Sequence, residues 1–223
     1  MPKKQSSPMT VQELKTLHND MSSEIECRLG QFERLWEEGD EEDLLAELVF
    51  CLFTPQSKAR SCWGAVECLI DRELLLSGAA GDIANELRVR GVRFHRHKAS
   101  YAVEARSHFI VDGDVQVRAV LWLSKEPDIM REWLVTNVRG LGYKEASHFL
   151  RNIGLGRDLA ILDRHILKNL AALGVIDQVP RTLTKRRYLE IEGAMRCFSK
   201  RVGIPMDNLD LLLWFREAGE VFK

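Results

Sequence analysis

Two helical patterns flank the stretch Val138-Arg139-Gly140-Leu141-Gly142-Tyr143-Lys144. On both sides of it, apolar residues recur at three- and four-residue spacing, which indicates a helix with one buried face. Two glycines separated by a single leucine allow the chain to reverse sharply with Leu141 turned inward. The sequence therefore predicts a helix–hairpin–helix motif over about residues 129–153.

The helix that follows these glycines offers a site for an anion. Its first backbone N–H groups have no partner within the helix, and bare glycines let a phosphate approach closely. We therefore expect Gly140, Leu141 and Gly142 to bind a nucleic-acid backbone through main-chain amides. Such contacts fix the position of the nucleic acid without reading its sequence.

Lys144 and Asp163 add chemistry to this motif. Lys144 lies in the first turn of the second helix, where the positive end of the helix dipole favours a neutral, nucleophilic amine. Asp163 follows the apolar run 159–162 and precedes another helical pattern. Taken alone, such a lysine is usually a surface residue and such an aspartate is usually a helix N-cap. Beside a phosphate-binding hairpin, the two predict attack of an amine on a sugar carbon.

The hairpin and Asp163, at this interval, resemble the helix–hairpin–helix DNA glycosylases. The longer string GLGYKEASHFLRNIG…LAILDRHIL, with Thr54-Pro55-Gln56 and a terminal Lys223, is similar to the 8-oxoguanine glycosylase/lyase of the archaeal and thermophilic-bacterial second type. The resemblance extends from about Phe50 onward. It implies a bifunctional repair enzyme that excises 8-oxoguanine and then cuts the abasic strand by β-elimination through a Lys144 Schiff base. Asp163 then stabilises positive charge on the sugar and helps to deprotonate the amine.

Further DNA contacts are expected, from the resemblance for Gln56 and from the local sequence for the others, and each has a plainer alternative. Gln56 faces DNA or braces the hairpin, although a loop glutamine with satisfied hydrogen bonds is the more common case. Arg164 and His165 contact phosphate, or they are surface residues of the first turn after Asp163. Phe94 lies among basic residues and either stacks on an extruded base or anchors the loop from below.

Base recognition is expected at the C-terminus. Trp214 shares a helix face with Asp210, and the resemblance implies that this tryptophan stacks on the flipped base while Lys223 helps to distinguish the base from guanine. 8-Oxoguanine carries N7–H where guanine carries a lone pair, so the pocket needs a hydrogen-bond acceptor at N7. A terminal carboxylate, a backbone carbonyl or Asp210 could each supply it.

The whole chain predicts an all-α fold with two helical domains and a DNA-binding cleft between them. From the resemblance, one domain comprises residues 1–45 and 156–223, and a helical barrel comprises residues 46–155. Helical spacing marks the main segments of the chain, and Asp112-Gly113-Asp114 is a turn signal; the expected helices include Val11–Trp36, Leu44–Phe53, Ser57–Leu76, His97–Phe109, Thr184–Arg201 and Met206–Ala218.

Composition limits the partners. The net charge is −1, so attraction to DNA must come from local clusters of basic residues, such as those between Glu86 and Arg106. The five cysteines lack the spacing of a zinc site or an iron–sulfur cluster, and no metal or organic cofactor is implied. No apolar run is long enough to span a membrane, and Met1–Thr10 predicts a tail, not a signal peptide. We expect a monomer in a prokaryotic cytoplasm, associated with the nucleoid.

Two other functions compete with this hypothesis. A sister glycosylase for oxidised pyrimidines is disfavoured by the missing cysteine cluster and by the C-terminal sequence LLWFREAGEVFK. A non-catalytic DNA-binding module could use the same hairpin. The module predicts that Lys144→Gln leaves behaviour unchanged apart from slightly weaker DNA binding.

Overall fold

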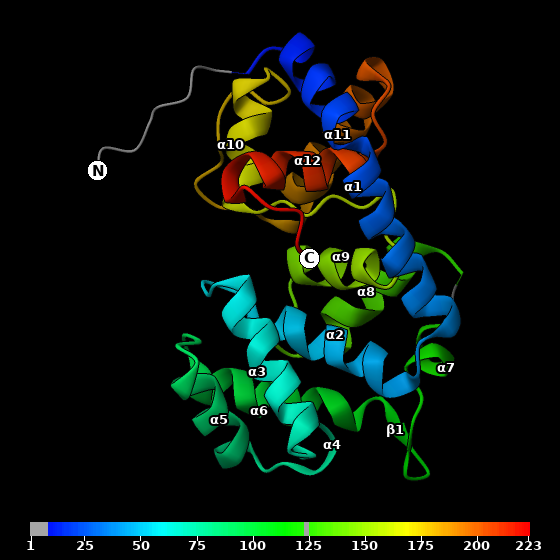
Figure 1. Ribbon diagram of the computed structural model, residues 1–223, viewed down its shortest axis with the longest axis vertical. Coiled ribbons are helices and arrows are strands. Elements are labelled where there is room, and N and C mark those ends of the chain that lie inside the picture. Colours follow the sequence, from blue (N-terminus) through cyan, green and yellow to red (C-terminus); the bar gives the residue numbers. More distant parts are fainter. Residues whose placement is uncertain (1–8, 123–124) are drawn as a thin grey trace. The chain divides into compact units, whose positions relative to one another are not determined.

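The computed structural model describes residues 9–122 and 125–223 of the chain (Figure 1). Most of these residues are helical, and the sheet that they contain is one antiparallel pair, β1 (Ile110–Val111) with β2 (Asp114–Val115). The all-α prediction is confirmed. The prediction of an N-terminal tail falls mainly on residues 1–8, which lie outside the described part.

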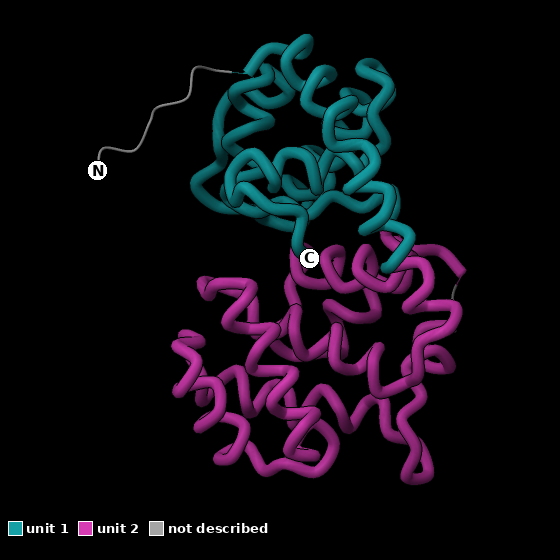
Figure 2. The backbone as a smooth tube through the Cα atoms, in the orientation of Figure 1, with its two compact units in different colours: residues 1–31, 157–222 teal, residues 32–156, 223 magenta. Residues whose placement is uncertain are grey.

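Two compact units divide the described residues (Figure 2). The first contains residues up to Gln31 and residues 157–222, and the second contains residues 32–156 and Lys223. Helix α1 (Val11–Glu38) begins in the first unit and ends in the second. The first boundary lies earlier than the predicted 45/46 because residues 41–45 belong to one unbroken helix of the second unit.

Helix α2 (Glu41–Phe53) is the centre of the second unit. Asp40 starts it, because its Oδ1 accepts the Asp43 N–H at 2.8 Å and the Asp43 carboxylate accepts the Asp40 N–H at 3.3 Å. Every residue from Leu44 to Phe53 is buried. Around α2 pack α3 (Ala59–Asp71), α6 (His95–Ser107), α7 (Val117–Leu121) and α9 (Tyr143–Asn152).

One predicted helix, Ser57–Leu76, is wrong in its extent. The structure has α3 up to Asp71 and a separate α4 (Leu74–Ser77), followed by α5 (Ala80–Val89). Glu73 between them has a left-handed backbone with φ of 56°, which ends a helix as a C-terminal glycine would. No glycine marks this position, and the apolar spacing continues through the break. The sequence therefore does not indicate that the helix ends here.

The turn predicted at Asp112-Gly113-Asp114 is confirmed, and in the structure it joins the two strands of a hairpin. Asp112 and Gly113 have φ values of 53° and 94°, and positive φ at both central residues matches the twist of the flanking strands. The strands themselves, two residues each, are too short to produce an alternating sequence pattern.

The predicted helix–hairpin–helix motif is also present. Helix α8 (Pro127–Asn137) precedes the turn at residues 138–142, and α9 follows it. Leu141 is buried, as expected from the apolar residue between two glycines.

The first unit combines the start of α1 with α10 (Arg164–Ala172), α11 (Lys185–Val202) and α12 (Met206–Ala218). Side chains of α11 hold the segment that leads to Asp163. The Glu192 carboxylate accepts the Ala160 N–H at 2.8 Å, and the Tyr188 hydroxyl accepts the Leu162 N–H at 3.3 Å. None of the helices in residues 9–122 and 125–223 combines the length and the apolar character that crossing a bilayer requires.

Candidate active site

The hairpin places backbone N–H groups at the start of α9, but some of them already donate hydrogen bonds within the protein. The Leu141 N–H donates to the Val138 carbonyl at 3.2 Å, and the Gly142 N–H donates to Glu145 Oε2 at 3.3 Å. The expectation that these first amides are unpaired is therefore corrected for Leu141 and Gly142. A glutamate three residues after the N-cap characteristically reaches back to this amide.

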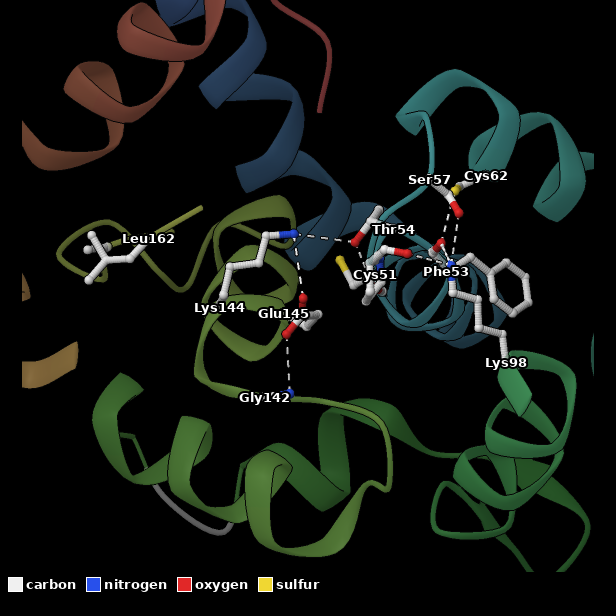
Figure 3. A network of polar contacts seen from close by, with 12 residues as sticks. Cys51, Phe53, Thr54, Ser57, Cys62, Lys98, Gly142, Lys144, Glu145 and Leu162 are labelled. Atoms are coloured by element: carbon white, nitrogen blue, oxygen red, sulfur yellow. Dashed lines mark hydrogen bonds and ion pairs between the residues drawn. The ribbon is translucent and has the colours of Figure 1, made fainter. Parts of the chain in front are cut away.

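Lys144 emerges beside this capped turn (Figure 3). Its Nζ lies 3.5 Å from Thr54 Oγ1 and 3.7 Å from Glu145 Oε1, and its side chain is 23% exposed. The Thr54 hydroxyl is oriented by its own hydrogen bond to the Cys51 carbonyl, at 2.9 Å. A partly exposed primary amine is thus held between an oriented hydroxyl and a carboxylate.

The turn after α2 carries Thr54 and Gln56. Gln56 is exposed and has a left-handed backbone with φ of 55°. Below it, Lys98 Nζ donates to the carbonyls of Phe53 and Pro55, both at 2.7 Å, and to Ser57 Oγ at 3.0 Å (Figure 3). Burial lowers the pKa of Lys98 to about 8, and its nearest charged neighbours add smaller effects.

Sequence reasoning counted Lys98 among surface bases and missed this burial. A signal was present, because Lys98 shares one face of α6 with the small residues Ala102 and Ala105, which are buried. A lysine in line with such residues points inward.

Phe94, just before α6, is half exposed and has a left-handed backbone with φ of 57°. The guanidinium of Arg93 lies over its ring at 5.5 Å from the centroid. The Arg93 N–H donates to Ser57 Oγ at 3.0 Å, so this loop is joined to the turn that carries Gln56.

Asp163 is the N-cap of α10, as the sequence suggested. Its Oδ1 accepts the N–H groups of His165 and Ile166, each at 2.8 Å. Among the described residues, the structure records no hydrogen bond to Oδ2, and the residue is partly exposed. One carboxylate oxygen therefore fixes the side chain, and the other is available for chemistry. The neighbouring Arg164 is exposed.

His165 and Trp214 lie together within the first unit. The imidazole meets the indole edge-on at 5.6 Å between centroids, and its Nδ1 is 3.1 Å from Glu217 Oε2. Trp214 is partly exposed, so it is not a core tryptophan, whereas Asp210 is buried in the same helix.

The C-terminal Lys223 belongs to the second unit. Its ammonium pairs with buried Glu47 and lies 3.1 Å from the centroid of the Trp63 ring. Asn152 supports the pair through a 3.0 Å hydrogen bond to Glu47 Oε2. Sequence reasoning missed Glu47 and Trp63, although a carboxylate inside the apolar pattern of α2 was a usable signal.

Comparison with known proteins gives a consistent family assignment. Residues 25–204 match the family model described as 8-oxoguanine DNA glycosylase. A Fusobacterium nucleatum protein named 8-oxoguanine DNA glycosylase/AP lyase is 46% identical over 95% of this chain and 96% of its own length. A protein of the same name from Korarchaeum cryptofilum is 41% identical, over 89% of this chain and 90% of its own.

Solved structures agree with the sequence comparisons. The 8-oxoguanine DNA glycosylase of Thermotoga maritima has a TM-score of 0.85 at 35% identity, covering 96% of this chain and 98% of its own. The Methanocaldococcus jannaschii 8-oxoguanine glycosylase/lyase, solved in complex with 15mer DNA containing 8-oxoguanine, has a TM-score of 0.86 at 33% identity. It covers 96% of this chain and 99% of its own.

Proposed function

The chain belongs to the 8-oxoguanine DNA glycosylase family, and from this premise we propose that it excises 8-oxoguanine from duplex DNA and cleaves the resulting abasic site. One observation carries the lyase half of this proposal. Lys144 presents a partly exposed amine at the first turn of α9, directly after the hairpin. A monofunctional glycosylase has no need of a nucleophilic amine at that place.

The amine of Lys144 attacks C1′ of the damaged nucleotide as the bond from C1′ to N9 of the base breaks, and the departing base takes up a proton. Opening of the sugar ring leaves a protonated O4′ and a Schiff base between C1′ and Nζ. Loss of a proton from C2′ then expels the 3′ phosphate and cuts the strand. Hydrolysis of the Schiff base returns the amine.

Asp163 assists this sequence through its Oδ2. A carboxylate stabilises the positive charge that develops on the sugar as the base leaves, and it can accept a proton from the Lys144 ammonium. The N-cap hydrogen bonds to Oδ1 support this role, because they restrict the side chain without using the second oxygen.

The remaining contacts position the DNA. We assign backbone binding to Gly140, Leu141 and Gly142, with Glu145 giving way to a phosphate at the Gly142 amide. Arg164, His165 and Gln56 complete the backbone contacts.

Base recognition falls to Trp214 and Phe94, which have exposed aromatic surface for stacking on the flipped base or its neighbours. The acceptor for N7–H is a terminal carboxylate, a backbone carbonyl or the Asp210 carboxylate.

We also propose that the protein acts as a monomer. Its curated relatives come from bacteria and archaea, whose chromosomal DNA lies in the cytoplasm. We therefore propose that it acts on DNA of the nucleoid.

Borohydride trapping on a duplex that contains 8-oxoguanine tests the proposal. The wild-type protein should form a covalent adduct with the DNA, and Lys144→Gln should form none while still binding the duplex. Asp163→Asn should keep the N-cap, because asparagine caps equally well, but lower the rate of base release by about 10²-fold or more.

Two variants control for these changes. Lys200→Gln removes an exposed lysine of α11, and Asp40→Asn alters the N-cap of α2. Both should behave like wild type. DNA binding with no adduct from the wild-type protein would establish the non-catalytic module instead, and cleavage of oxidised pyrimidines in preference to 8-oxoguanine would establish the sister activity.

A further inference from the structure

We propose that Lys98 is a positioning residue for this reaction, and that its ammonium holds together the turn that carries Thr54 and Gln56 and the loop that carries Phe94. This inference rests on the proposed function, because it assigns a role in presenting the nucleophile and two DNA contacts. Lys98 would not itself touch DNA, since its side chain is buried beneath the turn and 4% of the residue is exposed.

The ammonium is fully used in binding its own chain. A protonated lysine has three N–H donors, and Lys98 Nζ meets three acceptors, the carbonyls of Phe53 and Pro55 and the hydroxyl of Ser57. The Phe53 carbonyl belongs to the last turn of α2, where carbonyls lack partners within the helix. The interaction thus closes the end of α2 and the following turn around one cation.

Thr54 connects this cation to the nucleophile (Figure 3). The carbonyls on either side of Thr54, those of Phe53 and Pro55, are both bound by Lys98, so the backbone at Thr54 is fixed. The Thr54 hydroxyl is the oxygen that faces Lys144 Nζ at 3.5 Å. Loss of the Lys98 ammonium would let Thr54 shift and leave Lys144 less well oriented for attack on C1′.

Ser57 connects the same cation to the loop of Phe94. Its Oγ accepts both from Lys98 Nζ and from the Arg93 N–H, each at 3.0 Å. Gln56 and Phe94, the residues next to Ser57 and Arg93, both have left-handed backbones. Non-glycine residues keep this conformation where their surroundings enforce it, and Lys98 is a common support of both.

The charge on Lys98 is sensitive to pH because its three ligands are neutral. Burial lowers its pKa to about 8, Arg93 and Lys144 lower it further, and the Glu145 carboxylate on α9 opposes the shift; Cys62 on α3 also lies near the ammonium. The thiol of Cys62 has its own pKa raised by burial to about 11, so it stays protonated over the range in which Lys98 loses its proton. Above about pH 8 the Lys98 amine therefore has two N–H donors for its three acceptors instead of three.

Single-turnover base excision by Lys98→Met tests the proposal. At pH 7 we expect the rate constant to fall at least tenfold relative to wild type, with the borohydride adduct reduced in parallel. The ratio of the wild-type rate to the Lys98→Met rate, measured from pH 6.5 to 9.5, should then shrink above about pH 8. The two proteins in this ratio differ only at residue 98.

A purely structural role for Lys98 would give a ratio that is constant with pH, and that result would overturn the proposal. Equal rates for the two proteins at every pH would overturn it too. Wild-type protein that forms no adduct would instead remove the proposed function. Lys200→Met provides the matched control for replacing a lysine, and its rate should equal that of wild type.

Two further variants keep the test decisive where Lys98→Met does not fold. Lys98→Arg retains a cation with several donors and should keep more activity at pH 9.5, relative to its own rate at pH 7, than wild type does.

Ser57→Ala removes the oxygen shared by Lys98 and Arg93 and should lower the rate at pH 7 about three- to tenfold. Wild-type rates for Ser57→Ala, with Ser107→Ala as the control, would refute the link to the loop.

Discussion

At the scale of the residue, Gly140 determines how closely the hairpin can pack on α6. Its φ is 94°, and a Cβ at this position would lie 2.5 Å from Cδ2 of Tyr101 and within 3.2 Å of two other ring carbons. Real Cβ atoms do not approach a ring so closely. Any side chain there must displace Tyr101 or the turn.

We predict that Gly140→Ala lowers the free energy of unfolding by about 2–4 kcal/mol, the sum of a left-handed alanine and an overpacked contact. Gly113→Ala is the matched control, because Gly113 has the same φ of 94° with open space around it. It should cost about 1 kcal/mol. Urea unfolding of both variants measures the difference, which is the cost of the clash alone.

Removing the clashing ring provides the converse test. In a Tyr101→Ala background, Gly140→Ala should cost no more than Gly113→Ala does. An undiminished cost in that background would show that the backbone conformation, and not Tyr101, requires glycine at this position.

Residue roles were predictable from sequence where the signal is local. Asp163 before a helical pattern indicated an N-cap, and the structure has one. The glycines around Leu141 indicated an inward leucine, and it is buried. The burial of Lys98 and Glu47 had a local signal that was overlooked, but their partners had none, because these lie 41–45 and 105–176 positions away in the chain.

At the scale of the element, Arg118 joins three helices of the second unit. Its guanidinium donates to the carbonyls of Trp36 and Gly39 at 2.8 and 2.6 Å, and it pairs with the Glu41 carboxylate at 2.8 Å. These groups belong to the end of α1, the linker after it and the start of α2. One side chain on α7 therefore satisfies carbonyls that a helix end leaves without partners.

We predict that Arg118→Met lowers the free energy of unfolding by about 2–4 kcal/mol, because it leaves several carbonyls and a carboxylate unpaired. Arg186→Met is the control. Arg186 pairs with Glu190 four residues later on the surface of α11, and such exposed pairs contribute about 0.5 kcal/mol or less. Similar thermal unfolding midpoints for the two variants would show that Arg118 does not stabilise this junction.

The ends of a helix were predictable from sequence where a capping or helix-breaking residue marks them. Pro55 marks the end of α2, which was predicted correctly at Phe53, whereas the start was predicted at Leu44 and lies at Glu41, directly after Asp40. The break at Glu73 was missed because left-handed glutamate leaves no signature in composition. The role of Arg118 could not be predicted either, because it binds backbone carbonyls, and every residue type has a backbone carbonyl.

At the scale of the whole molecule, the pairing of the N-terminal helix with the last three helices is a non-local feature. The apolar stripe of α1 indicates a buried face but not its partner, so the grouping of both chain ends came from family resemblance. The first boundary, at Gln31, falls inside an unbroken helix and has no sequence signal. Patterns therefore identify helices, whereas the grouping of helices needs contacts between distant residues.

The stability of the whole molecule should fall in mild acid because of one histidine. His148 on α9 is buried against Phe50, with ring centroids 5.6 Å apart. Burial holds its pKa well below 6.5, and the positive charges of Lys144 and Arg151 lower it further. The folded protein keeps this imidazole neutral where an unfolded chain would protonate it.

The unfolded state therefore binds more protons than the folded state below about pH 6.5, and the free energy of unfolding decreases as the pH falls through that range. We predict a decrease of up to about 1.4 kcal/mol per pH unit from this group between pH 6.5 and 5.5. Urea unfolding at several pH values measures it. His148→Gln should remove the decrease, and His108→Gln, at an exposed position, should leave it in place. An equal pH dependence in wild type and His148→Gln would mean that other groups, and not this imidazole, cause the loss of stability in acid.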